Sequence, residues 1–79
     1  MLESFDAAGQ AAIVVDARGL GCPWPVLRLA RAVRDGGTCF VLLADDPATA
    51  GELAALAHDR GWQAAADGLE RYRIRVDAA

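Results

Sequence analysis

The sequence predicts an α/β (α+β) fold: a two-layer sandwich in the order βαβαββ, with two helices on one face of a mixed four-stranded sheet. Two short apolar runs, at 12–16 and 38–44, are each followed by a stretch of helical periodicity. Two more short strands flank Asp67-Gly68, a pair typical of a hairpin turn. The 79 residues suffice for one domain, 1–79, in which 1–10 are expected to be a loose lead-in.

A loop that contains glycine and proline joins the first strand to the first helix. "AAIVVDA" is short, apolar and β-branched, which predicts the strand at 12–16, and "RGLGCP" predicts the loop. The helix is expected from Pro23 onward, because first-turn N–H groups have no intrahelical acceptor and proline is tolerated there. Asp35-Gly36-Gly37 ends it. Its predicted apolar stripe comprises Val26, Leu27, Leu29, Ala30 and Val33, with Arg28, Arg31 and Arg34 on the other side.

The second half of the chain predicts a central strand, a second helix and a closing hairpin. "TCFVLLA" is apolar throughout, so this strand should be apolar on both faces and leave an exposed apolar patch on the open one. A right-handed parallel crossover is expected to connect it to the first strand. The second helix has Asp46 as N-cap, Pro47 at its first position, Glu52 near its positive end and Gly61 after its last residue. Its expected buried side is Leu53, Leu56 and Ala57.

Charge and cysteine content exclude several classes of protein. The net charge of −3 argues against a general nucleic-acid or anionic-membrane binder, so direct contact with DNA or RNA is not expected. The apolar runs are too short to span a membrane, and the N-terminus has no signal-peptide pattern. Two cysteines, 17 positions apart, form neither a disulfide framework nor a metal-ligand pattern. We therefore expect a cytoplasmic protein without a metal or cofactor.

Cys22 lies between a glycine and a proline, in the loop before the first helix or at its N-cap. The helix dipole is expected to stabilise a thiolate there by about 0.3 to 2 kcal/mol. That corresponds to a pKa roughly 0.2 to 1.5 units below the usual ~8.5. Pro23 and Pro25 lack N–H groups, so they favour a presented thiol over an oxyanion hole. The residues alone leave two interpretations of Cys22 open, a reactive thiol and a small buried hydrophobe.

Structural roles are predicted for the other residues that could carry chemistry. Cys39, inside an apolar strand, is expected to be buried, and His58 to be a solvated residue of the second helix. No cysteine–histidine–carboxylate arrangement is therefore predicted, which argues against a hydrolase. Asp45 and Asp46 are interpreted as helix caps and not as metal ligands.

The segment "VDARGLGCPWPVLRLARAV", followed by "LLADDPAT", resembles the small sulfur-carrier proteins of the TusA/SirA-like family. The family pattern D-x-x-G-L-x-C-P-x-P, with a later D-D-P, is matched by Asp16, Gly19, Leu20, Cys22, Pro23, Pro25, Asp45, Asp46 and Pro47. The resemblance spans residues 13 to 76 and implies the βαβαββ sandwich. It also implies that Cys22 takes a sulfane sulfur from a donor's persulfide, holds it as Cys–S–SH and passes it to an acceptor protein.

Together with the resemblance, the residues around the thiol define a candidate site. It comprises Cys22 as the catalytic residue, Gly21, Pro23 and Pro25 as positioning residues, and Trp24 and Arg28 as partner contacts. The implied donor is a protein of the cysteine desulfurase or rhodanese type, and family members serve tRNA thiolation, sulfur oxidation and molybdoenzyme maturation. Such a protein is a substrate in one step and a sulfurtransferase in the next.

The chain departs from the family pattern at Trp24, because members frequently carry an acidic residue between the two prolines. A bulky aromatic there changes the docking surface beside the sulfur from charged to apolar. The second helix, "AGELAALAHDRG", also differs from that of some members. An alternative hypothesis is a thiol-based regulatory or protein-interaction module that transfers no sulfur.

Overall fold

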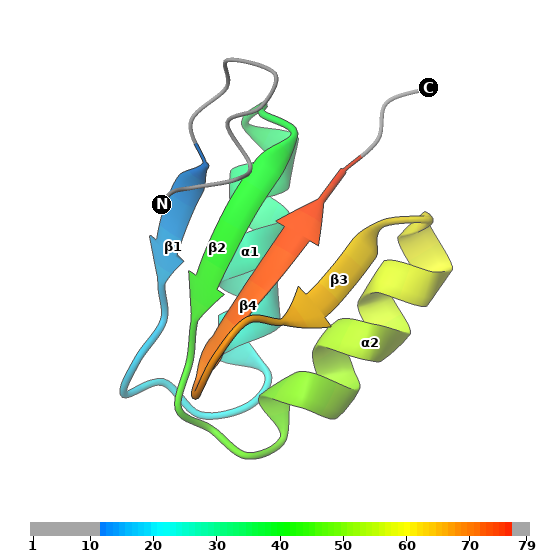
Figure 1. Cartoon of the computed structure of the whole chain (residues 1–79). Coiled ribbons are helices and arrows are strands. Elements are labelled where there is room, and N and C mark those ends of the chain that lie inside the picture. The colour runs from blue at the N-terminus through cyan, green and yellow to red at the C-terminus, as the bar shows by residue number, and fades with distance from the viewer. Residues whose placement is uncertain (1–11, 77–79) are drawn as a thin grey trace.

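The computed structural model describes residues 12–76, and the predicted lead-in at 1–10 lies outside this range. Within it, the elements follow the predicted order (Figure 1). They are β1 (Ile13–Asp16), α1 (Trp24–Arg34), β2 (Cys39–Leu43), α2 (Thr49–Arg60), β3 (Gln63–Ala66) and β4 (Arg71–Arg75). The predicted fold class is thereby confirmed. Neither helix in this range is long and apolar enough to cross a membrane.

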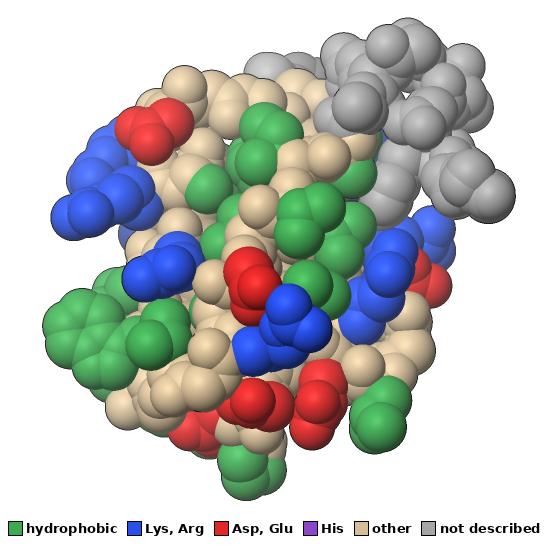
Figure 2. Space-filling view, turned by 90° about the vertical axis from the view of Figure 1, so that its left-hand side faces the viewer, with side chains coloured by type: hydrophobic (Ala, Val, Ile, Leu, Met, Phe, Trp, Pro, Cys, Tyr) green, Lys and Arg blue, Asp and Glu red, His purple; other side chains and the backbone are tan. Residues whose placement is uncertain are grey.

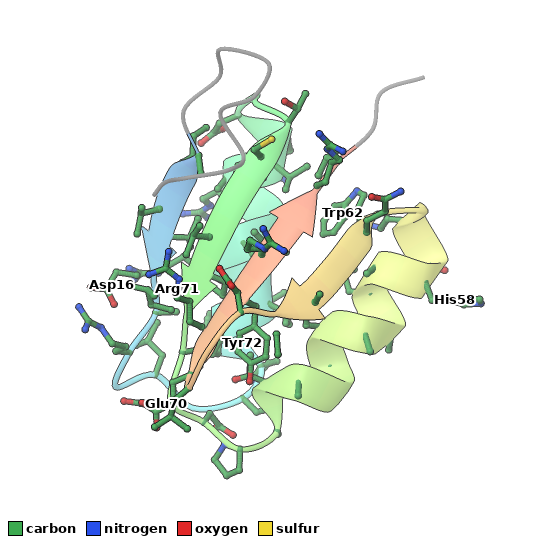
Figure 3. The ribbon with its side chains drawn as sticks, in the orientation of Figure 1. Asp16, His58, Trp62, Glu70, Arg71 and Tyr72 are labelled. Atoms are coloured by element: carbon green, nitrogen blue, oxygen red, sulfur yellow. The ribbon has the colours of Figure 1, made fainter. Side chains whose placement is uncertain are left out.

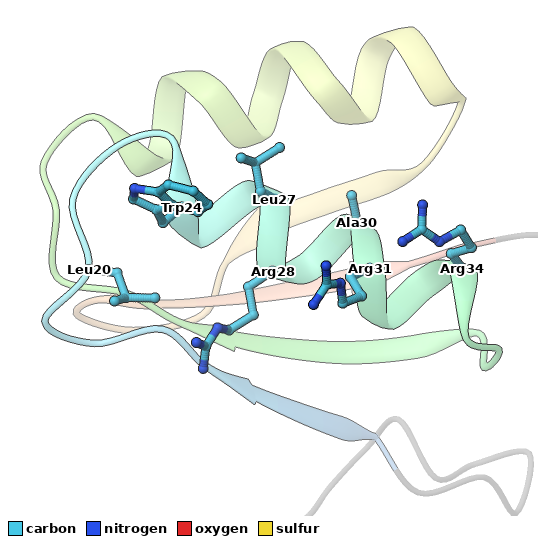
Figure 4. Close-up of a pocket in the computed structure, with 7 residues that line it drawn as sticks. All are labelled: Leu20, Trp24, Leu27, Arg28, Ala30, Arg31 and Arg34. Atoms are coloured by element: carbon cyan, nitrogen blue, oxygen red, sulfur yellow. The ribbon is translucent and has the colours of Figure 1, made fainter.

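The four strands form one mixed sheet in the order β1-β2-β4-β3. β1 and β2 are parallel, as the predicted crossover requires, whereas β4 is antiparallel to both β2 and β3. Both helices lie on the same face of this sheet, which gives the two layers (Figure 1 and Figure 4). Because parallel neighbours end at the same edge of a sheet, the segments that follow β1 and β2 lie close together.

The hydrophobic core fills the space between the helices and the sheet. Its most deeply buried large side chains are Leu29, Phe40, Leu42 and Ile74. Phe40 and Leu42 come from the central strand β2, and their register partners on β4 are Ile74 and Tyr72. The alternation along β4 thus turns Ile74 into the core and leaves the neighbouring arginines on the opposite face. On α2, Leu53 and Ala57 are buried and Leu56 packs against the core, as predicted.

The predicted apolar stripe of α1 is wrong at Leu27. Val26 and Leu29 are buried and Val33 packs against the core, whereas Leu27 is 48% exposed. A spacing of three and four residues keeps positions 26, 29 and 33 on one side of a helix, and position 27 lies about 100° away from 26. Leu27 therefore belongs to the outer surface.

The open face of the sheet does not carry the predicted apolar patch on β2. Cys39 is 5% exposed and Val41 is 4% exposed, although both alternate with the core-facing residues of β2. Their register partners on β4 are Arg75 and Arg73, and long arginine stems cover apolar surface of this kind. Among the strands, exposed large apolar side chains lie instead on the edge strand β1, which faces the viewer in Figure 2 and where Ile13 is 43% and Val14 60% exposed.

The second helix begins later than predicted. Its N-cap is Ala48, without a side-chain hydrogen bond, and α2 starts at Thr49. Asp46, the predicted N-cap, instead accepts the Ala48 N–H at Oδ1, 2.7 Å away, and so closes a turn ahead of the helix. The end of α2 is as predicted, because Gly61 adopts the left-handed conformation with φ of 75°.

Candidate functional site

The loop between β1 and α1 carries Cys22. It turns at its start, where the Leu20 N–H donates to the Ala17 carbonyl at 3.2 Å. Gly19 has φ of 83°, a conformation that a side chain disfavours. The Trp24 N–H then donates to the Gly21 carbonyl at 2.9 Å, so the chain winds directly into α1. Cys22 thus lies immediately before Pro23, the N-cap of the helix.

Two consecutive carboxylates from the segment after β2 brace this loop. The Gly19 N–H donates to both oxygens of Asp45, at 3.0 and 3.1 Å. The Cys22 N–H donates to Oδ2 of Asp46 at 2.7 Å, a distance typical of hydrogen bonds to charged acceptors. The adjacent ends of the parallel strands β1 and β2 make these contacts possible. Asp45 and Asp46 are therefore loop braces and not the helix caps that the sequence predicted.

Asp16 fixes the other side of the same loop. Its carboxylate accepts from the Arg18 side chain at 2.7 and 2.9 Å and from the Arg18 N–H at 3.1 Å. These contacts, above all the side-chain hydrogen bond from Arg18, lower the pKa of Asp16 to about 2. Because Asp16 ends β1, the pair holds the first residues of the loop against the end of the strand.

Cys22 is exposed, and its thiol contacts the first turn of α2. The sulfur donates to Oε2 of Glu52 across 2.6 Å. This hydrogen bond raises the pKa of the Cys22 thiol to about 11, with further contributions from desolvation and from the negative charges of Glu52 and Asp46. The predicted lowering of the pKa is therefore wrong. The start of α1 is as close as expected, but two nearby carboxylates outweigh a helix dipole worth about half a charge.

The pH dependence of Cys22 alkylation follows from this environment. A folded-state pKa near 11 means that the neutral thiol predominates below that value and the thiolate forms as the pH rises through it. We expect iodoacetamide to alkylate Cys22 with a rate that climbs toward a midpoint near pH 11, measured in a Cys39→Ala background. A free cysteine peptide with an ordinary midpoint serves as the reference. A midpoint at or below ~8.5 would contradict the Glu52 contact.

The three predicted positioning residues have different surroundings. Pro25 is fully buried in the first turn of α1, where it anchors the helix start to the core. Pro23 is exposed, and its carbonyl accepts the Leu27 N–H at 3.2 Å. A Cβ added to Gly21 would lie 3.6 Å from Asp46 Oδ2, which is an ordinary van der Waals contact. The space around Gly21 therefore allows a residue with a side chain.

The two predicted partner contacts, Trp24 and Arg28, line a groove of about 740 Å³ beside the site (Figure 4). Its lining residues are Leu20, Trp24, Leu27, Arg28, Ala30, Arg31 and Arg34. Trp24 is 59% exposed, so its ring is accessible to a partner. The Arg28 guanidinium donates to the Asp16 carbonyl at 3.3 Å, which leads its side chain along the groove toward β1. Apolar surface and positive charge therefore adjoin each other on α1.

Other residues take the structural places that the sequence predicted. Cys39 is buried in β2. His58 is exposed and extends from α2 away from the sheet (Figure 3). Among residues 12–76, no group of three or more histidine, cysteine or acidic side chains is arranged to hold a metal ion.

Sequence reasoning missed Glu52 as the partner of the thiol. It placed Glu52 near the positive end of the second helix, 30 residues from Cys22, and gave it no contact with the site. The sequence did contain a signal for this contact. The thiol precedes one helix and the acidic residue lies in the first turn of the other, and both segments follow strands of a parallel pair, whose ends lie at the same edge of the sheet.

Residues 13–77 match the model of a protein family described as sulfurtransferase TusA. The matched range includes all the elements described above, from β1 to β4. It also includes Cys22, both bracing carboxylates and Glu52.

Proposed function

The chain belongs to the TusA sulfurtransferase family, and we propose that Cys22 is the residue on which it carries sulfur. A sulfur-carrier role in general follows from the family. The observation that supports Cys22 is its exposure at the junction between loop and helix, where a second protein can reach the sulfur. The chain's other cysteine, Cys39, is buried in the central strand and is not accessible in this way.

The proposed chemistry is a pair of sulfur transfers. The Cys22 thiolate attacks the outer sulfur of a donor's persulfide, the new S–S bond forms, and the donor cysteine leaves with the electron pair as a thiolate. Cys22 now carries Cys–S–SH. In the second step an acceptor thiolate attacks that outer sulfur, and Cys22 is released as a thiolate. Each step exchanges one S–S bond for another, so no external oxidant or reductant is needed.

The proposed partners are a donor of the cysteine desulfurase or rhodanese type and an acceptor protein with a nucleophilic thiol. The test is to incubate the chain with such a donor and its sulfur source, then to measure its intact mass and map the modified peptide. We expect a gain of one sulfur, ~32 Da, on the peptide that contains Cys22. No gain with donors of both types, while Cys22 is shown to be free, would refute the proposal.

We propose further that the groove along α1 is the surface on which a protein partner docks. Trp24 and Leu27 offer exposed apolar anchors two to five residues from Cys22. Arg28, Arg31 and Arg34 add three positive charges along the same lining, which has no acidic member. This composition complements an acidic partner segment that carries an apolar side chain, since interface cores favour aromatic anchors and arginine.

A Trp24→Ala variant tests this docking. Removal of an aromatic hot-spot residue costs about 2 kcal/mol or more of binding free energy, so loading from a donor protein should fall about thirtyfold or more in kcat/KM. Loading by inorganic polysulfide, which needs no docking surface, should not change. Leu69→Ala is the matched control, because Leu69 is an exposed apolar residue on the β3–β4 hairpin, far along the chain from the groove. Equal loading rates for wild type and Trp24→Ala with the donor protein would show that the donor does not dock on this groove.

A further inference from the structure

Two carboxylates contact Cys22, one at its sulfur and one at its backbone N–H. Glu52 of α2 accepts the thiol proton at 2.6 Å, and Asp46, before α2, accepts the N–H of the same residue at 2.7 Å. Neither carboxylate forms an ion pair with an arginine of residues 12–76. The residues that follow Cys22 in the chain, Pro23, Trp24 and Pro25, have no ionisable side chain. These carboxylates disfavour the thiolate form of Cys22, whereas the dipole at the start of α1 favours it.

We infer that Glu52 holds Cys22 as a neutral, less reactive thiol between transfers, so that the sulfur becomes a better nucleophile when the Glu52 contact is lost. The inference rests on Cys22 being the sulfur-carrying residue. Glu52 is a positioning residue in this role: it contacts the thiol, and neither bonds to the transferred sulfur nor takes part in the exchange. Docking of a donor that displaces or neutralises the Glu52 carboxylate then releases the thiol for attack.

The size of the effect follows from the competition between ionisation and nucleophilicity. A thiol pKa of about 11, where 9.0 is ordinary, lowers the thiolate population at neutral pH by roughly 100-fold. The more basic thiolate is intrinsically more nucleophilic by roughly eightfold, for a Brønsted coefficient of about 0.4 to 0.5. The resting thiol is therefore about tenfold less reactive than an ordinary one.

This suppression suits a protein that must react only with its partners. Oxidation of cysteine follows thiolate character and exposure, and Cys22 is exposed. A neutral resting thiol limits loss of the carrier to oxidants and electrophiles. Once a second sulfur is bonded to Sγ, the thiol proton is gone and this hydrogen bond to Glu52 cannot form. The contact therefore distinguishes the empty carrier from the loaded one.

The test compares Glu52→Gln with Asp59→Asn, a matched control that removes the same charge from an exposed site at the other end of α2. Both are made in a Cys39→Ala background, and the rate of iodoacetamide alkylation is followed from pH 6 to 12. We expect Glu52→Gln to lower the midpoint pH and to raise the rate at pH 7.5 about tenfold. The same variant should load about tenfold faster with inorganic polysulfide. Asp59→Asn should match the parent protein.

The outcomes separate this inference from the proposed function. If Glu52→Gln alkylates no faster and keeps the same midpoint, the inference is wrong, whatever happens in sulfur loading. If alkylation responds as expected but loading becomes slower, Glu52 assists the transfer and does not restrain the thiol, and the inference is again overturned. If alkylation responds and no donor loads sulfur at all, the proposed function fails while the restraint of the thiol stands. Glu52→Ala should act in the same direction and replaces Glu52→Gln if that variant does not fold.

Discussion

A Cys22→Ser variant is expected to gain no sulfur from any donor while its fold stays intact. A hydroxyl does not ionise near neutral pH and forms no persulfide, so the variant without the Cys22 sulfur cannot accept sulfur. Cys22 is exposed and does not belong to the hydrophobic core, so the substitution should leave the thermal midpoint close to that of the wild type. Intact mass spectrometry after incubation with a desulfurase or rhodanese, together with circular dichroism, measures both effects.

Cys39→Ala is the control for this experiment, because it removes the other thiol of the chain. It should load one sulfur as the wild type does, since Cys39 is buried in β2 and does not meet a donor. A gain of ~32 Da on Cys22→Ser would move the carrier role to Cys39. Unfolding of Cys22→Ser would instead favour a structural role for the thiol, and would bring back the alternative of a module that transfers no sulfur.

The fold was predictable because its signals are local. β-branched runs, proline at a helix start and glycine at a helix end each act within a few residues of sequence, and they give the type and order of every element in residues 12–76, although the second helix starts later than predicted. The errors have a tertiary origin. Asp46 follows the rule for an N-cap, but its side chain is drawn into a turn and into a contact with Cys22 of another loop. Leu27 is apolar, but only packing decides which side of α1 faces the sheet.

The place of the candidate thiol in the fold was predictable from the sequence, and the charge around it was not. The position of Cys22 before a helix can be read from neighbouring residues, and the magnitude of the dipole effect can be estimated. The contact with Glu52 joins residues 30 positions apart, through the return of the chain after β2. Electrostatic effects depend on distance in space, so the sign of the pKa shift required the folded arrangement.

The braces explain why the family pattern joins a motif before one helix to a motif before the next. Asp45 holds Gly19 and Asp46 holds Cys22, so D-D-P and D-x-x-G-L-x-C-P-x-P are two halves of one structure. Parallel pairing of β1 and β2 brings the halves together. The sheet therefore positions the thiol, although the thiol lies outside it.

Phe40→Ala is expected to be the most destabilising single truncation of the core. Phe40 is fully buried on the interior strand β2, with Ile13 and Ile74 as its register partners on the two neighbouring strands. Removal of a buried phenylalanine side chain costs about 3 to 5 kcal/mol of unfolding free energy. A domain of this length has only about 4 to 12 kcal/mol in total. Urea denaturation followed by circular dichroism should show a large loss, with a fall in thermal midpoint on the order of 20 °C.

Val14→Ala on β1 is the comparison, because Val14 is an apolar residue of the adjacent strand that is 60% exposed. Its cost should stay below about 1 kcal/mol, and equal losses for the two variants would show that β2 is not the centre of the core. Cys39 provides a second readout in a Cys22→Ser background. Cys39 adjoins Phe40 in the sequence and is buried with it, so its labelling by a thiol reagent requires opening of β2. Phe40→Ala should speed that labelling about tenfold for each 1.4 kcal/mol of lost stability, because reaction through a transiently open state follows the open population.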